Sequence, residues 1–592
     1  MISNSDAPSG TSPPAPVPRT DSVLVVFLSG VIFFLAHFQA LTCYWVINDD
    51  VRQQIFWMQQ WRDHRLFPGD LLTDYARTYV PWGVKGLYRL TSLALDPITF
   101  TKWLPGLLFV FLGWCFFRLG CRLGSRRLAW FTLGVYWLTP FFLDNLSGGL
   151  ARAFAAPLLA FFCLSWMAAN PWGLGLALLL QALFIPYIFL IGAGATVLAW
   201  LAGRRGPGPT PSWITWGHLL IVALGSGLVL LMQHQFAAAG FGPLVSAGDM
   251  AGHPEFTARG RFAILPAPSF FWELIQPWEY LAPFREGGIL GGAAGVAVLL
   301  GAAVWGGRRL AWQDLEPRLQ PFWYLLLASL LLYLLARLFL LKLFVPDRYL
   351  MYTLNLCYCL GLALCLEAGV RPWPGSRGLA AAWVGLAVLL AVLRLQGVGL
   401  YDYSMYRPLY AALARTSPTA LLAGHPNLMD NTLTFGKRPA LATFELAHPW
   451  SQGYWRRLRP RLTDLFAAYY ADDPQVVRDF CRKYDISYLV VDDRHFTPEF
   501  LAGGRFLVPF AQPLEKKKKK LAEWVTCPFF APFNAQISTM VWGRRNFVLL
   551  QPDLFPVILV DTHQRLLDMR PFLQEKGAFS GISKGKKLCK NY

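Results

Sequence analysis

The sequence predicts a mainly α-helical, polytopic membrane protein of about eleven spans, followed by a soluble C-terminal α/β domain. Of the 592 residues, 55% are hydrophobic and only 15% are charged, whereas a soluble chain carries roughly a quarter charged residues. The mean hydropathy is +0.37. The apolar residues also gather in runs long enough to cross a bilayer of roughly 30 Å, and these runs stop near residue 400.

The first predicted span, Val23–Leu41, is not followed by an A-x-A cleavage site, so we expect it to stay in the protein as an anchor. The short apolar runs on either side of Pro186 fit either two tilted helices or one broken, re-entrant helix. The later spans are predicted at Trp103–Gly120, Leu128–Leu143, Leu150–Ala168, Trp172–Ile185, Tyr187–Leu201, Trp213–Met232, Gly288–Trp305, Phe322–Phe344, Tyr349–Leu366 and Leu379–Leu395.

Basic residues in the short loops indicate the orientation of the chain. With a cytoplasmic N-terminus, four arginine-bearing loops all fall on the cytoplasmic side, as the positive-inside rule requires. The net charge of +19 therefore indicates membrane orientation and anionic lipid, and not nucleic acid. The arginines are Arg118, Arg122, Arg126 and Arg127, then Arg204 and Arg205, then Arg308, Arg309 and Arg318, then Arg371 and Arg377.

The chain divides into three predicted parts. Residues 1–21 are rich in Ser, Pro and Ala and are expected to form a disordered cytoplasmic N-terminus. Residues 22–399 form the transmembrane domain, with large outer loops at 44–102 and 233–286. Residues 400–592 form the α/β domain, on the periplasmic or extracellular side.

The last part carries short buried runs and amphipathic stretches. Strands are predicted at Ala420–Gly424, Tyr488–Asp492, Phe547–Leu550 and Pro556–Val560, and helices at Leu462–Tyr470 and Pro474–Tyr484. The run Lys516–Lys520 favours a solvated loop over a contact with anionic headgroups. Cys481 and Cys527 can pair if this domain lies in an oxidising compartment.

The strongest chemical feature is Asn48-Asp49-Asp50, just beyond the first span. Carboxylates are costly beside lipid, so they tend to be functional, paired or solvated. One of them can bind a divalent cation or act as a general base on an acceptor hydroxyl; helix capping is the simpler alternative. The following stretch Val51–Arg65, with Arg52, predicts an amphipathic surface helix, and Trp82–Leu95, with Lys85, predicts a second one.

Two further outer turns carry charged residues. Arg152 lies in the first turn of an apolar span and needs an anionic partner, either Asp144 or a phosphate. Asp144 can also meet Asp49 or Asp50 across the bundle and share a cation. Arg348 in Pro346-Asp347-Arg348-Tyr349 is either a phosphate clamp or a snorkelling anchor.

No nucleotide-binding, α/β-hydrolase or zinc-protease motif is present, so no nucleotide cofactor is expected.

These motifs resemble those of the GT-C superfamily of membrane glycosyltransferases, which includes protein O-mannosyltransferases, the aminoarabinose transferase of lipid A and oligosaccharyltransferases. Asn48-Asp49-Asp50 is similar to the acidic motif of the family's first outer loop, Asp144 to its second acidic position, and Arg348-Tyr349 to an arginine that contacts the lipid phosphate. The first motif is Asp-Asp and not the Asp-Glu typical of mannosyltransferases, so the acceptor stays open. The C-terminal stretches that resemble bacterial members are Arg438-Pro439, Phe444-Glu445, Asp464–Tyr470 and Asp485–Val491.

The resemblance implies a glycosyltransferase (EC 2.4) that moves sugar from a polyprenyl-phosphate donor to a lipid, glycan or protein acceptor, on the outer face of a bacterial inner membrane. Asp49, Asp50 and Asp144 would be the catalytic carboxylates, and Asp49 and Asp144 would hold a divalent cation, Mg²⁺ or Mn²⁺. The donor phosphate would be bound by Arg52, Lys85, Arg152, Arg348 and Tyr349.

Three other functions stay open. A polymerase or ligase of surface polysaccharide would extend a chain instead of adding one sugar. A transporter or flippase of the lipid carrier would place charges in the centre of the bundle and show related helical halves. A non-enzymatic scaffold of envelope assembly would tolerate conservative changes of the aspartates.

Overall fold

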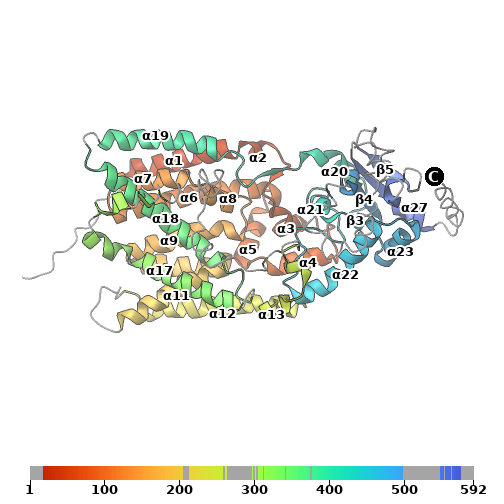
Figure 1. The fold of residues 1–592 in the computed structure, drawn as a ribbon, viewed down its shortest axis with the longest axis horizontal. Coiled ribbons are helices and arrows are strands. Elements are labelled where there is room, and N and C mark those ends of the chain that lie inside the picture. The colour runs from red at the N-terminus through yellow and green to blue at the C-terminus, as the bar shows by residue number, and fades with distance from the viewer. Residues whose placement is uncertain are drawn as a thin grey trace, which may run out of the picture.

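The apolar runs fold into helices that lie side by side in one bundle, and the C-terminal region folds into an α/β domain at one end of it (Figure 1). This confirms the predicted fold class. The computed structural model describes residues 18–574 except 205–212, 258–259, 263, 265–296, 298–299, 302–303, 311, 340–341, 374–375, 498–499, 501–546, 552–553 and 562. Most of the predicted span Gly288–Trp305, the lysine run Lys516–Lys520 and Cys527 lie outside these residues.

Six helices of the described residues are long and apolar enough to cross a membrane, so we treat the chain as an integral membrane protein. They are α1 (Arg19–Ala36), α6 (Pro97–Leu123), α11 (Pro186–Gly203), α12 (Trp216–Ala238), α17 (Trp312–Leu338) and α18 (Arg348–Val370). Other predicted spans hold shorter helices: α7 (Arg126–Trp137), α8 (Pro140–Leu146), α9 (Ala155–Met167), α10 (Pro171–Phe184) and α19 (Ser376–Arg394). The total of about eleven spans stays a prediction.

The chain forms two helices around Pro186. Helix α10 ends at Phe184 and α11 begins at Pro186, because proline starts a helix readily but cannot continue one. Gly192 of α11 lies against Leu178 and Gln181 of α10. The two helices therefore fold back on each other, which agrees with the two-helix alternative and not with a single broken helix.

The helix ends that flank the arginine-rich loops gather at the end of the bundle opposite the C-terminal domain (Figure 1). Arg126 forms two hydrogen bonds with Asp21, at 2.5 and 2.6 Å, and Arg127 bonds Glu367 from Nε at 2.9 Å. Helix α1 begins at Arg19, so residues 19–21 are helical and not part of a disordered tail. Residues 1–17 lie outside the described residues, and the cytoplasmic side of this end stays a prediction.

The C-terminal domain contains a four-stranded mixed sheet of order β3-β4-β6-β5. Strand β3 (Leu422–Gly424) is parallel to β4 (Tyr488–Asp492), while β6 (Gln564–Asp568) is antiparallel to β4 and to β5 (Val557–Val560). The helices of this region are α20 (Arg407–Ala414), α21 (Pro426–Thr434), α22 (Gln452–Tyr469), α23 (Pro474–Tyr484) and α27 (Met569–Gln574).

One predicted strand of this domain is wrong. Val548–Leu550 forms a 3-10 turn, η8, and not a strand. Phe547 beside it packs its ring against Tyr470 and Phe496. A short apolar run indicates burial, but it does not determine whether the backbone is extended or helical.

Short helical segments connect the bundle to the C-terminal domain (Figure 1). They are α3 (Val51–Gln54), the 3-10 helix η1 (Phe56–Trp61), α4 (Leu71–Tyr79) and α5 (Trp82–Thr91). The single surface helix predicted over Val51–Arg65 is wrong, because the helix breaks at Ile55. Phe56, Trp57 and Met58 are buried, so this apolar face packs against protein and not against lipid.

Candidate active site

The motif Asn48-Asp49-Asp50 is fixed by the segment that follows the last membrane helix. Strand β1 (Val46–Ile47) pairs with β2 (Tyr401–Asp402), and Asn48 Nδ2 donates to the Gly399 carbonyl at 2.7 Å. Gly399 has a φ of +70°, and a Cβ at this position would lie 2.9 Å from Asp144 Oδ1. Glycine is therefore needed here for two reasons: it adopts this left-handed backbone conformation readily, and a side chain would not fit.

Asp50 forms an ion pair with Arg152. Arg152 Nη2 also donates to Asn48 Oδ1 at 3.1 Å, so two residues of the motif hold one guanidinium. The anionic partner expected for Arg152 is thus Asp50, and not Asp144. The side chains of Arg152 and Asp50 are 24% and 25% exposed, so the pair stays open to an incoming anion.

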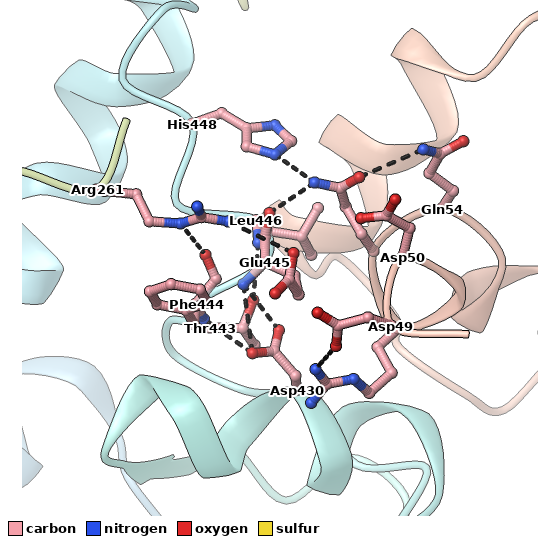
Figure 2. A network of polar contacts seen from close by, with 12 residues as sticks. Asp49, Asp50, Gln54, Arg261, Asp430, Thr443, Phe444, Glu445, Leu446 and His448 are labelled. Carbon is pink, nitrogen blue, oxygen red and sulfur yellow. Dashed lines mark hydrogen bonds and ion pairs between the residues drawn. The ribbon is translucent and has the colours of Figure 1, made fainter. Parts of the chain in front are cut away.

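Asp49 is directed toward the C-terminal domain (Figure 2). Its Oδ1 accepts a hydrogen bond from the Tyr403 hydroxyl at 2.8 Å and pairs with Arg52. Asp49 Oδ2 has no hydrogen-bond partner among the described residues, and the side chain is 37% exposed. One carboxylate oxygen is therefore held in place while the other is free to accept a proton.

Arg52 connects the first outer loop to the C-terminal domain. Besides its ion pair with Asp49, it donates from Nη1 to Asn431 Oδ1 at 3.0 Å, and its guanidinium lies 4.3 Å from the Tyr403 ring centroid. The residue is only 6% exposed. These contacts fit a residue that links two parts of the protein. They fit less well the phosphate-binding role that the sequence predicted for Arg52.

Asp144 and Arg348 lie on the bundle side of the motif. Asp144 is exposed and lies within electrostatic reach of Asp50, Arg152 and Arg348. No ion pair reaches Asp144 within the part of the chain that the structure describes. Asp50 is therefore the aspartate of the first motif that lies within electrostatic reach of Asp144, and a cation shared between Asp144 and this motif stays a prediction.

Tyr349 is not available at the site. Its hydroxyl donates to the Leu343 carbonyl, its ring packs edge-on against Tyr187, and the residue is 1% exposed. It belongs to the packed interior beside Arg348. The donor-binding role predicted for Tyr349 therefore has no geometric support.

Lys85 lies in a separate hollow of about 560 Å³ beside the first outer loop. The hollow is lined by Trp57, Gln60, Trp61, His64, Arg77 and Lys85. Lys85 Nζ donates to the Arg77 carbonyl at 3.2 Å, and burial together with Arg77 lowers the pKa of Lys85. The Arg77 guanidinium lies 5.6 Å from the Trp57 ring centroid, so cations and aromatic faces share this space.

The C-terminal domain adds polar residues that the sequence did not single out as site residues (Figure 2). Asp430 of α21 accepts hydrogen bonds from the backbone N–H groups of Phe444 and Glu445, both at 3.1 Å. Arg261, from the second outer loop, lies 3.4 Å from Glu445 Oε2. The only sequence signal was the pair Phe444-Glu445 within the resemblance, because nothing in the spacing places residues so distant in the chain beside Asp49.

The carboxylates do not form a cation site in the described residues. Among those residues, no group of three or more His, Cys, Asp or Glu side chains stands close enough to hold a metal ion. Hard cations such as Mg²⁺ need near-octahedral oxygen ligands, whereas Asp49 and Asp50 are already paired with Arg52 and Arg152. The two predicted ligands, Asp49 and Asp144, therefore do not form such a donor set for Mg²⁺ or Mn²⁺ among the described residues.

No family model and no curated protein sequence matches the chain, but solved structures are similar to it. An Archaeoglobus fulgidus oligosaccharyltransferase in complex with Zn and sulfate matches with a TM-score of 0.49 and 12% identity, over 81% of this chain and 69% of that one. The archaeal oligosaccharyltransferase AglB from the same organism, with an inhibitory peptide and a dolichol-phosphate, matches with a TM-score of 0.44 and 12% identity, over 82% and 71%.

ArnT from Cupriavidus metallidurans in the apo state matches with a TM-score of 0.39 and 14% identity, over 94% of this chain and 99% of that one. Oligosaccharyltransferases and the aminoarabinose transferase are kinds of enzyme in the superfamily that the sequence resembles. At these identities and TM-scores the likeness is distant, and the chemistry of the site rests on this chain's own residues.

Proposed function

We propose that the protein is a membrane glycosyltransferase that moves a sugar from a polyprenyl-phosphate donor to an acceptor hydroxyl on the outer face of the membrane. The supporting observation is the pair of carboxylates at the mouth of the bundle. Asp50 holds Arg152 on the membrane side, and Asp49 keeps a free oxygen on the side of the C-terminal domain.

The donor phosphate binds on the bundle side of the motif in this proposal. The polyprenyl chain stays in the bilayer, so its phosphate arrives at the level of Arg152 and Arg348. Guanidinium groups neutralise the charge that develops on the phosphate as it leaves. Asp50 and Asn48 keep Arg152 in position for this role, and Asp144 limits the positive charge of the same region.

The acceptor binds between Asp49 and the C-terminal domain. Asp49 Oδ2 takes the proton of the acceptor hydroxyl, while the acceptor oxygen forms a bond to the anomeric carbon of the sugar. The bond from that carbon to the phosphate oxygen breaks, and its electron pair stays on the phosphate beside the arginines. A single displacement of this kind inverts the anomeric configuration.

Lys85 binds the donor at a distance from the reacting atoms. The hollow that it shares with Arg77 offers two cations and the faces of Trp57 and Trp61. Such a surface suits an anionic glycan or phosphate group, since cations pair with the charge and the indoles cover apolar ring faces.

The proposal is tested with purified full-length protein in detergent and a panel of polyprenyl-phosphate sugars. Released polyprenyl phosphate and the anomeric configuration of the product are measured together. We expect one donor to be cleaved with inversion and one sugar to be added per acceptor. Processive extension would instead indicate a polymerase, and failure to cleave any donor would contradict the proposal.

A further inference from the structure

A loop of the C-terminal domain, residues 443–448, reaches the first outer loop and is fixed from two sides (Figure 2). Gln53 Nε2 donates to the Glu445 carbonyl at 2.8 Å and lies 2.6 Å from His448 Nε2. On the other side, Asp430 accepts from the backbone N–H groups of Phe444 and Glu445. The position of Glu445 beside Asp49 and Asp50 is therefore set by its backbone.

The Glu445 side chain is buried and weakly paired. The residue is 6% exposed, and its ion-pair partner is Arg261, at 3.4 Å. Arg261 is itself oriented by Phe444, since its Nε donates to the Phe444 carbonyl at 3.0 Å and its guanidinium lies 3.9 Å from the Phe444 ring centroid. Arg261 therefore compensates a charge on Glu445 only in part.

The charges around Glu445 do not balance if every carboxyl group is ionised. Groups that face it from the packed elements are the acids Asp49, Asp50 and Asp430, the cations Arg52 and Arg261, the hydroxyls of Tyr79 and Tyr403, and His448 of its own loop. Arg152 also belongs to this set because it pairs with Asp50. The four carboxyl groups, counting Glu445 itself, are therefore faced by three guanidinium groups. Carboxylates that share one site raise one another's pKa, so one of them keeps its proton to a higher pH.

Of these carboxyl groups, Glu445 is the favoured site for a proton, because it is buried and its ion-pair partner Arg261 lies 3.4 Å away. Burial, and next the charge of Asp430, raise the pKa of Glu445 to about 8, whereas the pKa of Asp430, closer to Arg52 and bonded by backbone N–H groups, rises only to about 6. The raised pKa favours the neutral form of Glu445 at pH 7. A neutral carboxyl group adds no repulsion toward an anionic substrate.

Resting on the proposed function, we propose that Glu445 is a positioning residue which the C-terminal domain supplies to the site, and which holds a proton so that an anionic donor can bind at Arg152, on the bundle side of Asp50. It acts through the two aspartates, which stay paired with Arg52 and Arg152 while Glu445 is neutral. Loss of the proton adds a negative charge and weakens donor binding.

The proton is tested directly by infrared difference titration of the full-length protein in nanodiscs, without substrate. We expect a protonated carboxyl band that disappears as pH rises through about 8 in the wild type and in Asp464→Asn, a control that removes a carboxylate elsewhere in the same domain. The band is absent in Glu445→Gln. A band that persists unchanged in Glu445→Gln, or no carboxyl group that titrates above pH about 6, would overturn the inference.

A second variant covers the case in which Glu445→Gln does not fold. Glu445→Asp keeps a carboxyl group on the loop but withdraws it by one methylene, so the midpoint of the titrating band is expected to shift. An unchanged midpoint would assign the band to another residue and contradict the inference.

Transfer assays then separate this inference from the proposed function. If only the neutral form binds the donor, KM for the donor rises about tenfold between pH 7 and 9 in the wild type and stays flat in Glu445→Gln, with a smaller change in kcat. Equal pH dependence in both proteins would overturn the inference. Absence of transfer in every protein would contradict the proposed function, while the infrared result would still decide the state of Glu445.

Discussion

Arg52 of the first outer loop donates a hydrogen bond to Asn431 of the C-terminal domain, from Nη1 to Oδ1 at 3.0 Å. The same guanidinium pairs with Asp49. One side chain therefore joins the predicted base to Asn431, which lies 379 positions after Arg52 in the chain. The residues of the candidate site come together only where these two parts of the protein are in contact.

Truncation of Arg52 should weaken this connection. In Arg52→Ala, the buried Asn431 amide and Asp430 lose their cationic neighbour, and we expect the free energy of unfolding to fall by about 2 kcal/mol. Transfer should also fall, because Asp49 loses its partner. Thermal unfolding in nanodiscs measures the first effect. The exposed Arg62 of the same loop provides the control, and an Arg62→Ala protein that is equally destabilised would contradict the interpretation.

Arg152 should contribute to the reaction and not to the fold alone. Removal of one donor that stabilises developing charge costs roughly 100- to 1,000-fold in kcat, and we expect this loss in Arg152→Gln. Arg152 and Asp50 form one ion pair. The Asp50→Asn substitution should therefore lower kcat much less in the Arg152→Gln protein than in the wild type. Steady-state kinetics of the four proteins test this, and strictly additive losses would show that the two residues act independently.

The raised pKa of Glu445 predicts a pH dependence of stability. Its pKa is about 8 in the folded protein against an ordinary value of 4.5, so between these values the folded protein holds a proton that the unfolded chain has lost. Stability therefore decreases as pH rises through this window. Thermal unfolding should show a steeper decrease in the wild type than in Glu445→Gln, and parallel curves would count against the assignment.

Transfer should survive removal of divalent metal ions. Asp49 and Asp50 are already compensated by Arg52 and Arg152, so the developing phosphate charge has cationic partners without a metal. We expect the rate with EDTA to equal the rate with added Mg²⁺ or Mn²⁺. A loss of transfer with EDTA that either ion restores would show that an ion binds in a geometry not present in this structure.

The helices of the bundle could be predicted because a long apolar run by itself indicates a membrane-spanning helix. The same holds for α23, whose bounds Pro474–Tyr484 match the prediction, since proline marks its start and its apolar residues recur at helical spacing. The break at Ile55 could not be predicted. It depends on the packing of Phe56 and Trp57 in the protein interior, and the sequence pattern alone does not contain this information.

Part of the candidate site could be predicted from the sequence, because a charged side chain beside lipid is costly and so draws attention. Asp49, Asp50 and Arg152 stand out because charges beside lipid need partners, but no local pattern indicates that Arg152 pairs with Asp50 and not with Asp144. Glu445 gave no such signal. Its place beside Asp49 comes from the contact of Gln53 with Glu445, 392 positions later in the chain. The sequence alone gives no sign that these two segments are in contact.

The most direct test of the central claim compares sugar transfer by the wild type with transfer by Asp49→Asn, in purified full-length protein with the polyprenyl-phosphate donor that the panel identifies. Asparagine keeps the shape of the side chain but cannot accept the acceptor proton. We predict a loss of at least about 100-fold in kcat, with the donor KM nearly unchanged. Transfer by Asp49→Asn at the wild-type rate would contradict the assignment of Asp49 as the base and the account of this site.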